Sequence, residues 1–237
     1  MKALILAAGM GTRLTPITDC LPKTMVPVNG KPILFKQIEN LLENGIEDIT
    51  VVAGYKAQAL IDAVSSRFPG VRVLNSVDYA TTNNMYSAYF ARGYVQDGDF
   101  LMMNADVFFD SSVIAALLAH PAENAIVTDV GRYIDESMKV VREDGRLTAI
   151  SKQIPPEDAY GSSIDVYKFS RAAGEAFFAQ CRDYIENKGE LKLWSEVALH
   201  DILKTVPFEA CPLQGRWLEI DNQDDLEAAE ALFGGKA

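Results

Sequence analysis

A loop of small residues near the N-terminus has the residue types that suit phosphate binding. Gly9 and Gly11 follow an apolar run, and Arg13 and Lys23 come soon after them. Glycine lets backbone N–H groups turn toward an anion at close range, because no Cβ stands in the way. A guanidinium fork and an ammonium point charge both suit a polyphosphate. The sequence therefore predicts a polyphosphate site built from the two cations and from Leu6, Ala7, Ala8, Gly9, Met10, Gly11 and Thr12.

This loop differs from the two commonest phosphate-binding motifs. The dinucleotide fingerprint needs a third glycine and an immediate helix, whereas Pro16, Pro22 and Pro27 keep the chain extended here. A Walker loop needs Gly-Lys-Ser/Thr, which does not follow. A Gly-x-Gly after a strand is common in α/β proteins, so the assignment depends on Arg13 and Lys23.

A carboxylate at the end of another apolar run is a candidate metal ligand. Asp106 follows the run 100–103 and Asn104, which is a candidate nucleotide-binding residue. In open parallel sheets ligands sit at the carboxyl ends of the strands, so Asp106 should face the same crevice as the glycine loop. Mg²⁺ prefers one or two carboxylates together with phosphate oxygens and water. The alternative is a turn aspartate that caps a helix starting near Ser111.

The elements that must position these residues alternate along the first half of the chain. Apolar runs at 3–6, 48–53 and 71–74 alternate with helical stripes starting near 33 and 57, which predicts a parallel sheet covered by helices on both faces. The strands expected from residue 125 onward form hairpins instead. We therefore expect a single α/β domain with a Rossmann-like mixed sheet, parallel in its N-terminal part and extended by antiparallel strands.

Composition limits the classes of partner. The chain has 237 residues, 49% of them apolar, with no low-complexity tract or linker. A net charge of −11 argues against nucleic acid and against an anionic membrane, because both reward clustered Lys and Arg. Three scattered cysteines fit a reducing compartment, and there is neither a signal peptide nor an apolar run of about 20 residues. We expect a cytoplasmic protein, either a monomer or a homodimer.

The N-terminal motif resembles that of a known family. LAAGMGTRL, followed by Pro22-Lys23, Pro27 and Lys31-Pro32-Ile33-Leu34, is similar to the signature of the nucleotidyltransferases that join a nucleoside triphosphate to a phosphorylated small molecule. Within that superfamily, the segments 83–87 (NNMYS) and 219–221 (EID) resemble the choline-phosphate cytidylyltransferase branch of bacteria and its phosphonate-activating relatives. The resemblance implies a nucleotide-binding part over about residues 1–120 and an acceptor-binding part over about residues 121–237.

The resemblance also implies roles for individual residues. Asp221 matches the second carboxylate that holds Mg²⁺ together with Asp106, although an aspartate before a helix is more often a cap. Asn84 and Ser87 would read the pyrimidine of CTP; the alternative is a plain helix cap at Asn83 and Asn84. Lys152 is similar to a lysine that contacts the acceptor phosphate, and a surface lysine is the alternative.

The head group of the acceptor stays open between two chemistries. A quaternary ammonium, as in phosphocholine, needs aromatic walls, for which Tyr86 and Trp194 are candidates together with Tyr133, Tyr160 and Trp217. A primary amine, as in 2-aminoethylphosphonate, needs carboxylates, for which the candidates are Asp129, Glu136, Asp165 and Glu196.

The implied reaction is a direct displacement at the α-phosphorus that releases pyrophosphate. A phosphate monoester has a second pKa of about 6, so the acceptor needs no general base. Arg13, Lys23, Asp106 and Asp221 are then the candidate catalytic residues, with Mg²⁺ as cofactor. The alternatives are a sugar-1-phosphate nucleotidyltransferase, a glycosyltransferase and a non-catalytic nucleotide-binding module.

Overall fold

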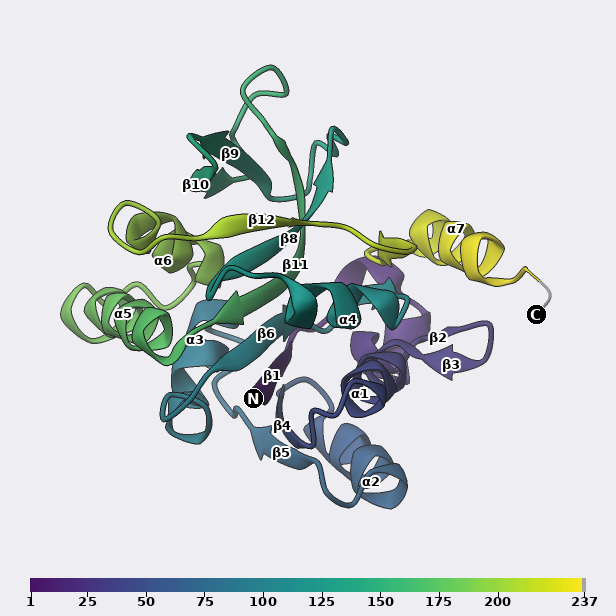
Figure 1. The fold of residues 1–237 in the computed structure, drawn as a ribbon. Helices are drawn as coiled ribbons and strands as arrows, with labels where there is room; N and C mark the ends of the chain where they lie inside the picture. Colours follow the sequence, from purple (N-terminus) through teal and green to yellow (C-terminus); the bar gives the residue numbers. More distant parts are fainter. Residues whose placement is uncertain (236–237) are drawn as a thin grey trace.

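A mixed β-sheet of nine strands forms the centre of the structure, which is a computed structural model and describes residues 1–235 (Figure 1). The main strand order is β10-β9-β11-β6-β1-β4-β5, with β8 paired to β11 and β12 paired to β8. The strands are β1 (Lys2–Ala7), β4 (Asp48–Ala53), β5 (Arg72–Asn75), β6 (Phe100–Asn104), β8 (Ala125–Val130), β9 (Lys139–Glu143), β10 (Arg146–Ser151), β11 (Gly161–Phe169) and β12 (Glu209–Pro212).

The parallel half of the sheet carries helices on both faces. β1 pairs in parallel with β4 and β6, and β4 pairs in parallel with β5. Apolar residues of one sheet face pack with α1 (Ile33–Glu43), α2 (Ala57–Arg67) and α4 (Ser112–Ala119), and those of the other face with α3 (Asn84–Phe90), α5 (Arg171–Arg182) and α6 (Ser195–Ile202). The predicted α/β architecture is confirmed, because continuous apolar runs form strands that are buried on both sides.

Antiparallel strands extend the sheet beyond β6, as expected. β11 runs antiparallel to β6, β8 and β9, and β9 and β10 form a hairpin. The pairing of β11 with β8 is irregular between Ser163 and Tyr167, and Asp165 within this bulge has a φ of 58°. Bulges turn side chains out of the regular alternation, and left-handed backbone at a residue other than glycine is uncommon. Asp165 is therefore placed by a local distortion of its strand.

Two short ladders lie outside the main sheet. β2 (Pro27–Val28) pairs with β3 (Lys31–Pro32), and β7 (Val107–Phe109) pairs with β13 (Trp217–Glu219). The C-terminal helix α7 (Gln223–Phe233) follows β13 and packs on a small apolar cluster that includes Leu14 and Val26. The C-terminal helix thereby packs against the N-terminal part of the chain, where it contacts β2 (Figure 1).

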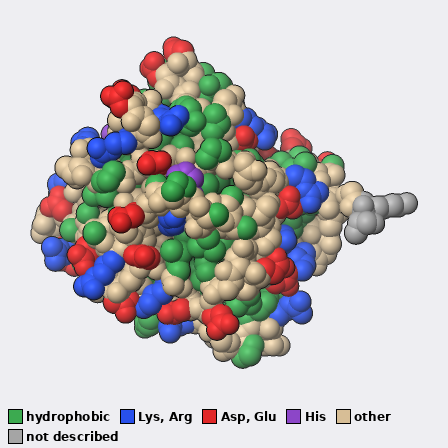
Figure 2. All heavy atoms as spheres, in the orientation of Figure 1, with side chains coloured by type: hydrophobic (Ala, Val, Ile, Leu, Met, Phe, Trp, Pro, Cys, Tyr) green, Lys and Arg blue, Asp and Glu red, His purple; other side chains and the backbone are tan. Residues whose placement is uncertain are grey.

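Charges of both signs are mixed over the surface. On the face drawn in Figure 2, acidic and basic side chains alternate without forming a continuous area of one sign. Among the described residues, no helix has the length and the apolar character that crossing a membrane requires.

Candidate active site

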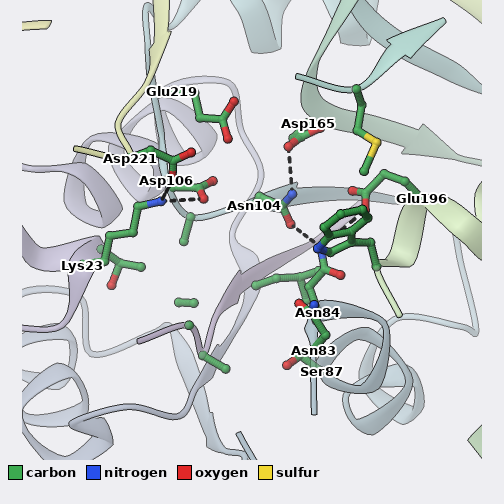
Figure 3. Close-up of a pocket in the computed structure, with 18 of the residues that line it drawn as sticks. Lys23, Asn83, Asn84, Ser87, Asn104, Asp106, Asp165, Glu196, Glu219 and Asp221 are labelled. Carbon is green, nitrogen blue, oxygen red and sulfur yellow. Dashed lines mark hydrogen bonds and ion pairs between the residues drawn. The ribbon is translucent and has the colours of Figure 1, made fainter. Parts of the chain in front are cut away.

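A cleft opens where β1 and β6 end, beneath the antiparallel extension of the sheet (Figure 3). Glu136, Asp165 and Glu219 line it, as do most of the predicted site residues, namely Leu6, Ala7, Ala8, Gly9, Arg13, Lys23, Asn84, Ser87, Asn104, Asp106, Lys152, Trp194, Glu196 and Asp221. The glycine loop and Asp106 thus share one crevice, as the parallel sheet predicts.

Gly11 shapes the loop without lining the cleft. Its φ is 61°, and a Cβ built on it would lie 2.5 Å from Cβ of Lys23, so only glycine fits. Met10 is exposed, and Thr12 begins the 3₁₀ turn Thr12–Leu14 that carries Arg13. Gly11 and Thr12 therefore support the cationic side chains, and neither they nor Met10 line the cleft.

The two cations are paired with acidic side chains. Nζ of Lys23 lies 2.9 Å from Oδ2 of Asp106 and 2.6 Å from Oδ1 of Asp221. Arg13 places Nη2 2.7 Å from Oδ2 of Asp221 and Nη1 3.0 Å from Oε2 of Glu136. Burial alone would lower the pKa of Lys23, but the two aspartates raise it above its ordinary value, so the ammonium stays charged.

The β7–β13 ladder brings together carboxylates that are far apart in the sequence. Val107 pairs with Glu219, and the backbone N–H of Ile220 donates to the carbonyl oxygen of Asp106 over 2.9 Å. Asp106 and Asp221 therefore flank the same end of this ladder. Each strand has three residues, which is too short for a periodic apolar pattern to predict.

Supporting polar residues hold the ends of this ladder. The side chain of Gln37, on α1, is fully buried and donates to the carbonyl oxygens of Asn104 and Val107 over 2.9 and 2.8 Å. Asn222 caps α7 in a capping box with Asp225. Asn222, and not Asp221, is therefore the cap of α7. The carboxylate of Asp221 remains available to the cleft.

Three carboxylates form a group that fits a divalent cation. One oxygen each from Asp106, Glu219 and Asp221 lie within 4.8 Å of one another. Oδ1 of Asp106 is buried without a hydrogen-bond partner among the described residues. Burial, followed by the charges of Asp106 and Asp165, raises the pKa of Glu219 to about 9. A hard cation with oxygen ligands suits such a site. Glu219 was not among the predicted ligands, although it lies in the 219–221 segment that carries the resemblance.

A closed ring of hydrogen bonds lies on the other side of the cleft, and Figure 3 shows its members Asn84, Asn104, Asp165 and Glu196. Nδ2 of Asn84 donates to Oδ1 of Asn104 over 3.2 Å and lies 3.5 Å from Oε2 of Glu196. Nδ2 of Asn104 donates to Oδ2 of Asp165 over 3.0 Å. The hydroxyl of Tyr167 lies 2.8 Å from Asp165 and 2.9 Å from Glu196 and completes the ring.

The ring contains two carboxylates, those of Asp165 and Glu196, which share the single hydroxyl proton of Tyr167. One phenol proton cannot serve both Asp165 and Glu196. Among the ion pairs of residues 1–235, none includes either carboxylate. Burial, followed by the charges of Glu196 and Asp106, raises the pKa of Asp165 to about 7. The ring is therefore suited to accept a cation that carries N–H donors.

The ring also changes the role that we assign to Asn84. Its Oδ1 accepts from the backbone N–H of Ser195 over 2.8 Å, and its Nδ2 faces Asn104 and Glu196. The amide is thus engaged with the protein, so we infer that it positions Glu196 and the start of α6. Ser87 is buried at the cleft wall and stays a candidate for contact with the base.

Two of the predicted acceptor-binding residues do not line the cleft. The hydroxyl of Tyr86 donates to Asp78 over 3.0 Å, and Oδ2 of Asp129 accepts from Nε1 of Trp217 over 2.8 Å. Both are engaged in local structure, and we no longer assign them to the acceptor. Lys152 and Trp194 do line the cleft, where Nζ of Lys152 lies 5.1 Å from the centroid of the Trp194 ring.

Comparisons with known proteins agree with this architecture. The family model for "Nucleotidyl transferase" matches residues 2–139. A choline-phosphate cytidylyltransferase of Streptococcus pneumoniae is 46% identical over 104 residues, which are 42% of this chain and 44% of that protein. A glucose-1-phosphate thymidylyltransferase of Streptomyces griseus is 29% identical over 95% of this chain and 64% of its own length.

Solved structures extend the similarity to the whole chain. The structure described as CTP:phosphocholine cytidylyltransferase from Streptococcus pneumoniae superposes with a TM-score of 0.80 and 27% identity and covers 97% of both chains. The aligned regions of the first curated relatives span 44% to 64% of those proteins' own lengths. The sequence similarity therefore covers only a part of each curated relative, whereas the structural similarity covers nearly all of the solved cytidylyltransferase chain.

Proposed function

Because the chain belongs to the nucleotidyl transferase family, we propose that it transfers a cytidylyl group from CTP to a small acceptor that bears a phosphate or phosphonate and an amine. The family is the one that the N-terminal motif resembles. The observation that carries the proposal is the arrangement of one cleft in which Lys23 bridges Asp106 and Asp221 while an acidic ring lies opposite. The first group suits the reacting phosphates and the second suits the head group of the acceptor.

The proposed reaction is a displacement at phosphorus. An oxygen of the acceptor forms a bond to the α-phosphorus of CTP, and the bond from that phosphorus to the β-phosphate oxygen breaks. Pyrophosphate leaves with the electron pair. Catalysis then consists of aligning two anions and neutralising the charge that develops. In this proposal Lys23 would contact the α-phosphate, and Arg13, in the turn that follows the glycine loop, would hold the leaving phosphates.

Asp106, Glu219 and Asp221 are the residues that would hold Mg²⁺. The ion would supply positive charge to the phosphate oxygens at the α-phosphorus. The positive charge of the ion would replace the ammonium of Lys23 as the counter-ion of the aspartates, which would leave Lys23 free to bind the substrates. The unpartnered oxygen of Asp106 supports this use of the group.

The ring supports a primary amine as the head group. An ammonium with N–H donors can bond to Asp165 and Glu196 directly, and each such bond is charge-assisted. A quaternary ammonium has no N–H donor and needs aromatic walls. Of the five aromatic residues considered for that role, Trp194 lines the cleft. We therefore place 2-aminoethylphosphonate ahead of phosphocholine as the acceptor.

The choice of CTP rests on similarity to the choline-phosphate cytidylyltransferase of Streptococcus pneumoniae, which both the sequence comparison and the structural comparison find. A sugar-1-phosphate is the alternative acceptor, with UTP, dTTP or another nucleotide as donor. The alignment with a glucose-1-phosphate thymidylyltransferase, which covers 95% of this chain, is the observation that favours it.

The proposal is tested by measuring pyrophosphate release in Mg²⁺ with each donor and acceptor in turn. The donors are CTP, UTP, dTTP, ATP and GTP, and the acceptors are 2-aminoethylphosphonate, phosphocholine and glucose-1-phosphate. We expect release with CTP and 2-aminoethylphosphonate. Release only with the sugar phosphate would move the chain to the alternative, and silence in every pairing would contradict the catalytic role.

A further inference from the structure

Lys139, at the start of β9, has an unusual environment for a lysine. Its side chain is 3% exposed, and its Nζ lies 3.0 Å from the carbonyl oxygen of Asp135, 3.3 Å from that of Ser137 and 3.4 Å from that of Ile134. Among the ion pairs of the described residues, none includes Lys139. A buried ammonium that is held by backbone carbonyls alone is expensive to desolvate, so its retention needs a reason.

The three carbonyls belong to one loop, residues 131–138, which connects β8 to β9. This loop contributes three consecutive residues, Glu136, Ser137 and Met138, to the cleft wall. Glu136 accepts from Arg13, and Oγ of Ser137 lies 3.4 Å from Oε2 of Glu219. The loop thus touches a predicted phosphate-binding cation, Arg13, and a carboxylate of the candidate metal site, Glu219.

Several hydrogen bonds besides those of Lys139 fix this loop to β11 and the residue before it. The backbone N–H of Gly131 donates to the carbonyl oxygen of Tyr160 over 3.1 Å, and the backbone N–H of Ser163 donates to that of Met138 over 2.7 Å. Oγ of the buried Ser162 donates to the carbonyl oxygen of Arg132 over 2.9 Å and accepts from the backbone N–H of Ile134 over 3.4 Å. Ser162 therefore holds the first half of the loop. Ser163 holds Met138 at the far end, and Lys139 holds the stretch 134–137 between them, which carries Glu136 and Ser137.

We propose that Lys139 is a positioning residue that anchors the 131–138 loop so that Glu136 and Ser137 stay at the catalytic end of the cleft. The ammonium does not touch substrate. It acts through the carbonyls, each of which loses a charge-assisted hydrogen bond when the ammonium is removed. This role in catalysis rests on the proposed function, whereas the anchoring of the loop is a property of the unliganded chain.

Lys168 provides a matched control. Its side chain is 7% exposed, and its Nζ also donates to backbone carbonyls, those of Leu117 over 3.3 Å and His120 over 2.9 Å. These carbonyls lie at the end of α4, and Lys168 does not line the cleft. Replacing either lysine by methionine keeps the apolar stem and removes the charge, so both variants should lose thermal stability.

Hydrogen exchange on the unliganded proteins tests the anchoring directly. In Lys139→Met, amides of residues 131–138 should exchange at least about tenfold faster than in the wild type, because hydrogen bonds to a charged group are lost. In Lys168→Met, the same amides should keep the wild-type rate. Equal rates over 131–138 in the two variants would overturn the proposal, whatever their melting temperatures.

Steady-state kinetics tests the consequence. Lys139→Met should lower kcat/KM for the acceptor by about tenfold, because a misplaced cleft wall misaligns the reacting groups. Lys168→Met should keep the wild-type value when both are assayed well below their melting temperatures. Normal kinetics in Lys139→Met would overturn the catalytic consequence. Failure of the wild type to turn over any substrate pair would count against the proposed function, and hydrogen exchange would still decide the anchoring.

Discussion

At the scale of single residues, the candidate site is organised by the balance of charge around Lys23. Three carboxylates that converge in a partly buried cleft repel one another, and Lys23 with Arg13 offsets this repulsion when no substrate is bound. A bound polyphosphate would attract Lys23 away from the carboxylates, and a bound divalent cation would take its place beside them. Lys23 can therefore stabilise the unliganded protein and then bind the substrates.

Replacing Lys23 by methionine should remove this charge at the reacting phosphates. We expect kcat to fall by about 100-fold or more, because a preorganised charge at a developing anion contributes that much. Lys204→Met is the control, since it removes an exposed lysine paired with Asp201. Turnover measured with saturating substrates should be unchanged in the control. Wild-type turnover in Lys23→Met would contradict the role assigned to Lys23.

Glu196 should set the affinity for the amine. Glu196→Gln keeps the shape and removes the charge, so KM for 2-aminoethylphosphonate should rise by about 10-fold to 100-fold, the cost of one charge-assisted hydrogen bond. KM for CTP should hardly change. Asp129→Asn, whose side chain bonds to Trp217 outside the cleft, is the matched control. An equal change in the KM values of both substrates would contradict the assignment of the ring to the acceptor.

Asp165 should make the stability of the unliganded protein depend on pH. Its pKa of about 7 lies above the ordinary value of 3.8, so the folded state binds the proton more tightly than the unfolded state does. The resulting stability is present below about pH 4 and is lost as the pH rises to about 7, by at most about 1.4 kcal/mol per pH unit. Asp165→Asn imitates the protonated acid and should not lose this contribution.

Urea unfolding of both proteins between pH 5 and 8, in the presence of a chelator, measures the difference. The stability of Asp165→Asn relative to the wild type should increase with pH up to about 7 and then level off. Two curves that stay parallel over this range would show that Asp165 does not titrate there.

Single residues also show how far the sequence allows the site to be predicted. Asp106 was predictable because it ends an apolar strand of a parallel sheet, where ligands gather. Asp165 was considered as one carboxylate among several, and the bulge that turns it into the cleft leaves no mark on the apolar pattern. Tyr86 and Asp129 were chosen by residue type alone, and their partners Asp78 and Trp217 could be identified only from the structure.

At the scale of elements, the glycine loop and the β7–β13 ladder decide where the charges meet. Gly11 allows the backbone to approach Lys23, and the ladder sets Asp106 against the 219–221 segment. The long elements were predictable from the apolar period, as α1 and β4 illustrate, because their signals extend over many residues. The pairing of β7 with β13 joins residues more than 100 positions apart and carries no such signal, although it brings the carboxylates together.

Gly11→Ala should disturb Lys23 through the loop. The added Cβ would lie 2.5 Å from Cβ of Lys23, and the φ of 61° would strain an alanine by about 1 to 3 kcal/mol. We expect kcat to fall at least tenfold, roughly the effect of a small misplacement of a catalytic group. Gly93→Ala is the control, because a Cβ there meets no atom within 4 Å. Equal turnover in the two variants would contradict the requirement for glycine at position 11.

At the scale of the whole molecule, the fold forms one cleft from both halves of the chain. The glycine loop and Lys23 come from the N-terminal part, and Asp165, Glu196 and Asp221 come from the part that follows residue 121. The division into a nucleotide-binding and an acceptor-binding part stays a prediction. It agrees with the placement of the acidic ring, in which the carboxylates belong to the second part and the two asparagines to the first.

The cleft belongs to an acidic protein, whose net charge is −11. Anionic substrates are repelled by such a surface, and this repulsion weakens as salt screens it. The local cations Arg13, Lys23 and Lys152, together with a divalent metal ion, would then provide the attraction that the molecule as a whole lacks.

Identification of the product by ³¹P NMR tests the central claim most directly. The protein is incubated with CTP, 2-aminoethylphosphonate, Mg²⁺ and a pyrophosphatase that removes the leaving group. We expect the CTP signals to be replaced by two mutually coupled resonances, one from a phosphate and one from a phosphonate, which identify a P–O–P bond between CMP and the acceptor. Unchanged CTP, or CTP converted only to CDP or CMP, would contradict cytidylyl transfer to this acceptor.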